Sequence, residues 1–302
     1  QVTTYYSNIC PNGAYQGYGA PKGNFAITMA LAELAEQLQI DQLEIIERNR
    51  VHEGQELKIL GAIGEGKAPT SVPSAASCAL EEILRQGREM IQWSSPKPQN
   101  GDWHIGRGVA IIMQKSGIPD IDQANCMIKL ESDGTFIVHS GGADIGTGLD
   151  TVVTKLAAEV LHCPPQDVHV ISGDTDHALF DKGAYASSGT CFSGNAARLA
   201  AENLREKILF HGAQILGEPV ADVQLATPGV VRGKKGEVSF GEIAHKGETG
   251  TGFGSLVGTG SYITPDFAFP YGANFAEVAV NTRTGEIRLD KFYALLDCGT
   301  PV

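Results

Sequence analysis

Residues 127–148 read MIKLESDGTFIVHSGGADIGTG, and this stretch decides the class of fold that the sequence predicts. The apolar residues in 127–130 and 136–138 flank the turn pair Asp133-Gly134, a combination typical of a β-hairpin. A glycine-rich loop follows, and helical periodicity begins at 149 and continues to 162. A hairpin next to a separate helix favours an α+β protein over a doubly wound parallel sheet.

The segments on either side repeat this mixture of helices and hairpins. Strands are expected over 109–113 and 168–172, and a second hairpin turns near 233–236. A last hairpin pairs 275–280 with 287–296 across Thr284-Gly285. Helical periodicity covers 23–38, 42–50 after an Asp41 N-cap, 74–92 and 194–216. We therefore expect an α+β fold of hairpin-rich mixed sheets with packed helices, and a domain break between about 50 and 100.

Composition and charge narrow the class of function. The chain has 302 residues, of which 42% are hydrophobic and 19% are charged, as in soluble globular proteins. Its 23 basic and 35 acidic residues give a net charge of −12, which disfavours binding to nucleic acids or anionic membranes. No apolar run approaches the ~20 residues that a membrane-spanning helix needs.

The cysteines and the termini indicate cellular context. Six cysteines lie far apart without a CxxC pair, which predicts reduced thiols in a cytoplasmic protein instead of a disulfide framework or a metal cluster. The chain does not begin with Met, and it stops just after a strand-like segment. We expect it to be a piece of a larger protein.

Three glycine-rich loops each lead into a predicted helix. They read GAYQGYGAP at 13–21, GGADIGTG at 141–148 and GAYASSGT at 183–190. Small residues allow close approach of the backbone to a ligand, and helix N-termini offer free N–H donors. The loops are therefore either ordinary capped connections or a cradle for an anionic cofactor, and the residues alone leave both open.

Other motifs are weaker. Residues 61–68, GAIGEGKA, almost match a P-loop, but Ala68 lacks the hydroxyl for Mg²⁺ and Pro69 follows where a helix is required. These two departures from the motif weaken the interpretation of the chain as an unrelated nucleotide-binding enzyme. The polar cluster Asp174, Asp176 and His177 is interpreted as a solvated turn, and His162-Cys163 as packing at a helix end.

The first loop and its flank resemble a known family. Residues 7–22, SNICPNGAYQGYGAPK, are similar to the N-x-x-x-x-G-A-[FY]-R-G-[FY]-G-x-P-[QK] segment of the xanthine dehydrogenase/aldehyde oxidase family, the molybdenum hydroxylases. Residues 141–149 resemble its G-G-x-E-[MI]-G-Q-G-x loop, and 183–196 its T-x-[AG]-S-x-x-x-x-x-x-G-N-A segment. The order of the motifs extends the resemblance over nearly the whole chain, and bacterial xanthine/hypoxanthine dehydrogenase-like proteins are the most similar.

The resemblance implies a chemistry and a domain plan. It implies a molybdenum-dependent hydroxylase that oxidises an N-heterocycle or an aldehyde with oxygen from water. Its metal is held by molybdopterin, with or without an attached nucleotide, and electrons pass to 2Fe-2S and FAD groups in other domains or subunits of a homo-oligomer. Residues 1–50 would end a first molybdopterin-binding segment, 51–100 would form a connecting loop and helix, and 101–302 would begin a second, incomplete segment.

Site residues follow from the same resemblance, position by position. The main chains of Gln16 and Ala186 would lie against the molybdenum, and Tyr18 would pack on a planar substrate. The remaining cofactor contacts would be Gly17, Ile145, Gly146, Thr147, Ser187 and Ser188.

Two residues depart from the family pattern, and the first of them supports an alternative. Gln16 replaces the usual Arg and Thr147 the usual Gln. The family's general-base Glu is expected beyond Val302, so no catalytic residue is assigned here and the piece alone should be inactive. A non-catalytic binding or assembly subunit with the same fold is the alternative.

Overall fold

A computed structural model describes the chain except for residues 1, 2, 4, 11–15, 62–71, 250, 251, 265 and 267. The chain forms two compact units. Of the described residues, unit 1 comprises those up to 61, 72–114 and 269–299, and unit 2 comprises those of 115–268 and 300–302. The polypeptide thus leaves unit 1, forms unit 2 and returns. Both units combine antiparallel strands with separate helices, so the predicted α+β class is confirmed.

Unit 1 contains a four-stranded antiparallel sheet. Its order is β1 (Gln99–Asn100), β2 (Trp103–Met113), β10 (Tyr271–Asn281) and β11 (Ile287–Asp297). The predicted last hairpin is therefore present as β10 and β11. The pairing of β2 with β10 joins residues far apart in the sequence, which local patterns do not reveal.

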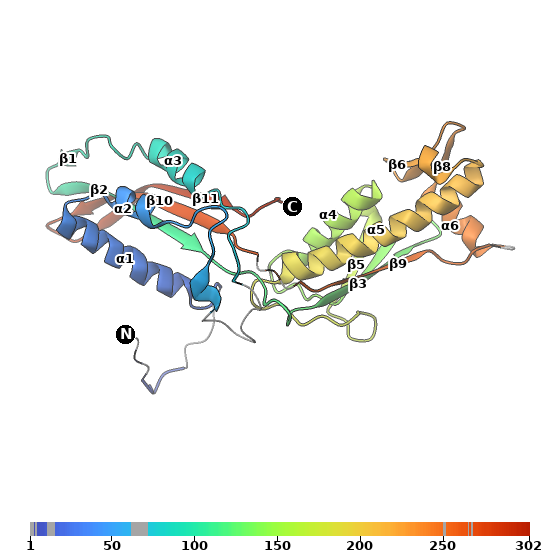
Figure 1. Ribbon diagram of the computed structural model, residues 1–302, viewed down its shortest axis with the longest axis horizontal. Coiled ribbons are helices and arrows are strands. Elements are labelled where there is room, and N and C mark those ends of the chain that lie inside the picture. Colours follow the sequence, from blue (N-terminus) through green and yellow to red (C-terminus); the bar gives the residue numbers. More distant parts are fainter. Residues whose placement is uncertain are drawn as a thin grey trace. The chain divides into compact units, whose positions relative to one another are not determined.

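Three helices pack on one face of this sheet: α1 (Ala20–Leu38), α2 (Gln42–Asn49) and α3 (Leu80–Met90) (Figure 1). A short 3-10 turn, Lys58–Gly61, lies between α2 and α3. The Asp41 carboxylate begins α2 by accepting the amide of Leu43 at 2.9 Å, as an N-cap does. Phe275 is fully buried in the core, and an added Cβ at Gly87 would lie 2.0 Å from its ring. Glycine at this position therefore allows α3 to contact the sheet.

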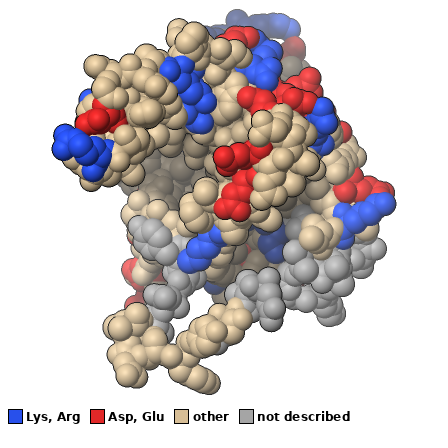
Figure 2. All heavy atoms as spheres, turned by 90° about the vertical axis from the view of Figure 1, so that its left-hand side faces the viewer, with Lys and Arg blue, Asp and Glu red and all other residues tan. Residues whose placement is uncertain are grey.

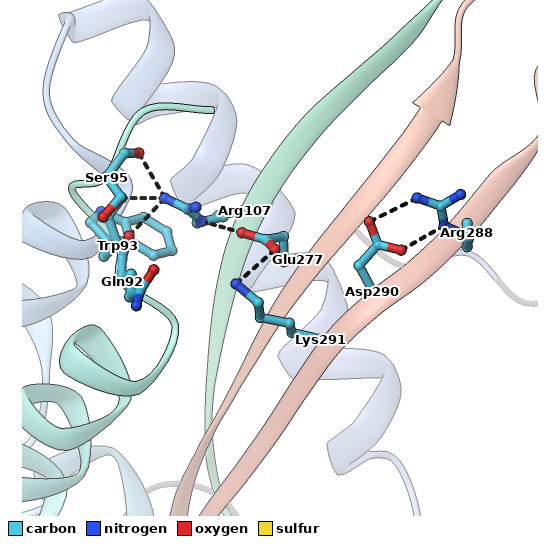
Figure 3. A network of polar contacts seen from close by, with 8 residues as sticks. All are labelled: Gln92, Trp93, Ser95, Arg107, Glu277, Arg288, Asp290 and Lys291. Atoms are coloured by element: carbon cyan, nitrogen blue, oxygen red, sulfur yellow. Dashed lines mark hydrogen bonds and ion pairs between the residues drawn. The ribbon is translucent and has the colours of Figure 1, made fainter. Parts of the chain in front are cut away.

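A buried ion pair links the neighbouring strands β2 and β10 of this sheet (Figure 3). The Arg107 side chain is 4% exposed and its Nε donates to Glu277 at 2.6 Å, while Lys291 contacts the same carboxylate at 3.0 Å. Burial raises the pKa of Glu277, but hydrogen bonds from Arg107 and Lys291 outweigh it and leave that pKa below its ordinary value. The Arg107 Nη1 also donates to the carbonyls of Gln92, Trp93 and Ser95.

We expect Arg107→Met to destabilise unit 1 by about 3 kcal/mol, because Glu277 loses its buried partner and the carbonyls lose a shared donor. Native-state hydrogen exchange of β2 and β10 amides in the full-length protein should accelerate roughly 100-fold. Arg283→Met is the matched control, because its pair with Asp102 is solvent-exposed and contributes little. Equal exchange in both variants would contradict the role of Arg107.

Unit 2 contains a four-stranded mixed sheet with the order β5, β4, β3, β9. The predicted hairpin is formed by β3 (Ala124–Leu130) and β4 (Phe136–Ser140). β5 (Val168–Ser172) pairs with β4 in parallel, so the chain must cross over, and α4 (Leu149–Leu161) with the 3-10 turn Pro165–Asp167 makes that connection. β9 (Val257–Tyr262) completes the sheet.

The long helix α5 (Gly189–Leu216) packs on this sheet at very close range. Its buried residues include four alanines with no exposed area: Ala196, Ala197, Ala200 and Ala201. An added Cβ at Gly258 would lie 2.3 Å from the carbonyl oxygen of Ala200, and one at Gly260 2.3 Å from that of Ala196. Glycine in β9 and alanine in α5 therefore bring the two backbones into contact.

The rest of unit 2 follows α5. A 3-10 turn, Val220–Asp222, leads to a three-stranded sheet of β6 (Gln224–Ala226), β7 (Val230–Arg232) and β8 (Glu237–Ser239). The predicted hairpin near 233–236 is the turn between β7 and β8. The helix α6 (Phe240–Glu248) begins with a capping box between Ser239 and Glu242.

The distribution of charged side chains and the hydropathy of the helices both bear on the expectations from composition. On the face drawn in Figure 2, Lys and Arg side chains alternate with Asp and Glu instead of forming one basic patch. Within the described ranges, no helix is both long and apolar enough to cross a membrane.

Candidate functional site

The 141–148 loop connects β4 to α4. Its Asp144 carboxylate accepts the amides of Gly146 at 2.8 Å, Gly148 at 3.2 Å and Asp150 at 3.3 Å. These hydrogen bonds, that of Gly146 foremost, hold the pKa of Asp144 below its ordinary value. The loop thus caps the start of α4 with its own carboxylate. Ile145, 67% exposed, projects from the same turn.

The 183–188 loop precedes α5 and has an unusual backbone. Ala186 and Ser187 have φ values of 49° and 57°, a left-handed conformation that residues other than glycine rarely adopt. Ser188, 5% exposed, donates its hydroxyl to the Tyr185 carbonyl at 2.8 Å. The helix begins at Gly189, before the start at 194 that the periodicity predicts.

These two loops and their neighbouring residues meet inside unit 2. An added Cβ at Gly141 would lie 2.2 Å from the Leu179 carbonyl oxygen, and one at Gly142 3.0 Å from the Ser193 hydroxyl. That hydroxyl donates to the Asp181 carboxylate at 2.8 Å. The segments before and after the 183–188 loop therefore hold the base of the 141–148 loop.

The loop at 13–21 belongs to unit 1, and its residues 13–15 lie outside those the structure describes. Gln16, Gly17 and Tyr18 form the turn before α1, with the amide of Ala20 donating to the Gly17 carbonyl at 2.9 Å. Gly17 has a φ of 86° and Tyr18 is 40% exposed. The predicted convergence of all three loops stays a prediction.

The alternative motifs have structural explanations where they are described. His177 and Asp174 pair at 2.9 Å on an exposed turn. His162 ends α4 in a left-handed conformation, and burial raises the pKa of Cys163 to about 12, which leaves an unreactive thiol. Residues 62–68 of the near P-loop lie outside the description. Among the described residues, no three His, Cys, Asp or Glu side chains gather as a metal site requires.

The residues present fit a molybdenum–pterin group that binds through main chain and small side chains. Ile145, Gly146 and Thr147 are exposed, and no atom lies within 4 Å of an added Cβ at Gly146 or Gly148. A planar group can therefore approach this backbone closely. A negatively charged part of the ligand would compete with the Asp144 carboxylate for the amides that it already binds.

One polar residue of this region has no recognisable motif in the sequence. Asp122 is 1% exposed, and its carboxylate accepts the Tyr185 hydroxyl from the 183–188 loop. The only sequence signal was an acidic residue in a short connection, which is common in solvated turns. Its burial depends on contacts with residues distant in the sequence.

The family of molybdopterin cofactor-binding domains matches residues 86–302 and, separately, residues 1–50. Over all 302 residues the chain is 99% identical to the "Probable hypoxanthine oxidase XdhD" of Escherichia coli K12, of which it covers 32%. It is 31% identical, over 98% of its length and 39% of the relative, to the "Putative xanthine dehydrogenase molybdenum-binding subunit XdhA" of that organism. The chain thus spans about a third of the length of these curated relatives.

A solved structure shares the fold. Reconstituted CO dehydrogenase from Oligotropha carboxidovorans aligns with a TM-score of 0.78, over 94% of this chain and 37% of that chain. The sequence identity is 20%, so this likeness concerns the fold alone.

Proposed function

The chain belongs to the molybdopterin cofactor-binding domains of the xanthine dehydrogenase family of molybdenum hydroxylases, and we propose that it forms part of the cofactor and substrate site of such an enzyme. The proposed reaction is the oxidation of a purine-like N-heterocycle with oxygen derived from water. The name of the 99% identical relative, a probable hypoxanthine oxidase, supports a purine-like substrate over an aldehyde.

One structural observation carries the proposal. Two loops expected to contact the cofactor, 141–148 and 183–188, lie on one scaffold, because Gly141 and Gly142 pack against the residues that flank the second loop. Each loop leads into a helix. In the 141–148 loop, no atom lies within 4 Å of an added Cβ at Gly146 or Gly148, so a ligand can approach this backbone closely. A shared scaffold is what a single large ligand contacted by both loops requires.

The residues have separate proposed roles. Ile145, Gly146, Thr147 and Ser187 are proposed to contact the pterin. The resemblance assigns Gly17 and Ser188 to the cofactor as well, although the Ser188 hydroxyl is already bound to the Tyr185 carbonyl. The main chains of Gln16 and Ala186 face the molybdenum side, and Tyr18 packs on the flat substrate. When bound, the molybdenum–pterin group supplies the redox chemistry. The proposed part of this chain is to bind and orient the cofactor and the substrate.

Partners and location complete the proposal. Electrons taken from the substrate must leave the site, and we propose that 2Fe-2S and FAD groups in other domains or subunits accept them. A homo-oligomer in the cytoplasm is the proposed assembly.

The test is elemental analysis with release of the pterin from the full-length protein, purified from cells that make the cofactor. We expect about one molybdenum and one fluorescent pterin per polypeptide, followed by oxidation of hypoxanthine-like purines with an artificial electron acceptor. Absence of both molybdenum and pterin would overturn the proposal and favour the non-catalytic assembly subunit. Loaded enzyme that oxidises aldehydes but not purines would correct the substrate class.

A further inference from the structure

Asp122 is a buried carboxylate with both oxygens engaged. Its Oδ2 accepts the amide of Ile118 at 2.7 Å, and its Oδ1 accepts the Tyr185 hydroxyl. A carboxylate buried to 1% exposure is costly unless hydrogen bonds compensate it, so its position demands a structural or functional explanation. The contact with Tyr185 suggests one, because Tyr185 precedes the two left-handed residues directly.

The turn that carries Asp122 contacts the 183–188 loop at a second point. The amide of Gly117 donates to the Ala186 carbonyl at 2.7 Å. Gly117 has a φ of 76°, and an added Cβ would lie 2.2 Å from the Phe192 ring, so glycine allows the turn to lie this close. Within the turn, the Asp122 amide donates to the Ile118 carbonyl at 2.9 Å. The turn is therefore closed, and it holds Tyr185 and Ala186 together.

The backbone that it holds is strained. Ala186 and Ser187 are two consecutive non-glycine residues in the left-handed region, which persist only where surrounding contacts fix them. The Ser188 amide and hydroxyl both donate to the Tyr185 carbonyl, so the position of Tyr185 also sets the start of α5. The contacts of Asp122 and Gly117 with Tyr185 and Ala186 thus form a clamp, because fixing the Tyr185 side chain also fixes the residues that follow it.

We propose that Asp122 is a positioning residue, which holds Ala186 and Ser187 in their left-handed conformation through the Tyr185 hydroxyl and so presents this backbone to the cofactor. The part of this proposal that concerns the cofactor rests on the proposed function. Asp122 is buried and contacts the loop through the Tyr185 hydroxyl, so its proposed action on the cofactor is indirect.

The first experiment measures the clamp without the cofactor. Full-length protein is prepared from cells that cannot make molybdopterin, and hydrogen exchange is followed in the peptide that spans 184–190. Tyr185→Phe should accelerate exchange there at least tenfold and leave the second half of α5 unchanged. Asp122→Asn should have a smaller effect than Asp122→Ala, because the amide oxygen keeps the shape and still accepts a hydrogen bond.

Asp120→Asn is the matched control, because Asp120 is an exposed acid in the same turn. Its exchange should equal that of the wild type. If Tyr185→Phe and Asp122→Ala also exchange like the wild type, the clamp does not exist. This result is independent of whether the protein binds a pterin, so failure of the clamp is distinguishable from failure of the proposed function.

The second experiment measures the consequence for the cofactor. The protein is prepared from cells that make the cofactor, and the molybdenum and pterin retained after gel filtration are measured. Retention should fall at least fivefold in Tyr185→Phe. Asp122→Asn should retain more of both than Asp122→Ala. A loosened loop with wild-type retention of both would overturn the positioning role. Wild-type protein that contains no pterin would instead overturn the proposed function.

Discussion

Replacing Gly260 with alanine is expected to destabilise unit 2 by about 3 kcal/mol, at the upper end of the usual cost of overpacking. The added Cβ would lie 2.3 Å from the Ala196 carbonyl oxygen and 2.4 Å from the Ala200 amide nitrogen. Both atoms belong to the backbone of α5, so no side-chain rotation relieves the clash. The strand β9 or the helix must move, and the buried alanines of α5 then lose their packing.

The measurement is native-state hydrogen exchange of β9 and α5 amides in the full-length protein, where we expect roughly 100-fold acceleration. Gly108→Ala is the matched control, because Gly108 also lies in a strand but has no atom within 4 Å of an added Cβ. That variant should exchange like the wild type. Equal exchange in both variants would show that β9 and α5 are not in backbone contact.

The contact at Gly260 also shows which kind of element sequence patterns do not predict. The hairpin of β3 and β4 was predicted because its turn and apolar residues are adjacent in the chain. Residues 257–262 read VGTGSY, and the alternating glycines give no hydrophobic period, so β9 was not predicted. Its strand forms because glycine fits against the alanines of α5, which is a long-range requirement.

The candidate site was predictable to a similar degree. The glycine-rich composition of 141–148 and 183–188 correctly indicated loops that lead into helices. Neither the capping of α4 by Asp144 nor the clamp by Asp122 was predicted, because each depends on where a short acidic side chain points after folding. The left-handed conformation at Ala186 was also missed, since alanine carries no signal for it.

Gly141→Ala is expected to separate the two loops and to reduce cofactor retention at least tenfold. An added Cβ at this position would lie 2.2 Å from the Leu179 carbonyl oxygen and 3.0 Å from the Asp181 amide nitrogen, so the 179–181 backbone must shift. Asp181 then moves away from the Ser193 hydroxyl, to which it is bound at 2.8 Å. The expected loss of stability is about 2 kcal/mol.

Gly189→Ala separates this effect from a general sensitivity of the region. Its added Cβ would lie 3.7 Å from the Leu149 side chain, an ordinary contact, and alanine favours the helix that starts there. Molybdenum and pterin content should therefore stay at the wild-type level in Gly189→Ala and fall in Gly141→Ala. If both variants keep their cofactor, the packing of the 141–148 loop against 179–181 is not needed for binding. If both lose it, the start of α5 tolerates no added methyl group, and the loss in Gly141→Ala cannot be assigned to separation of the loops.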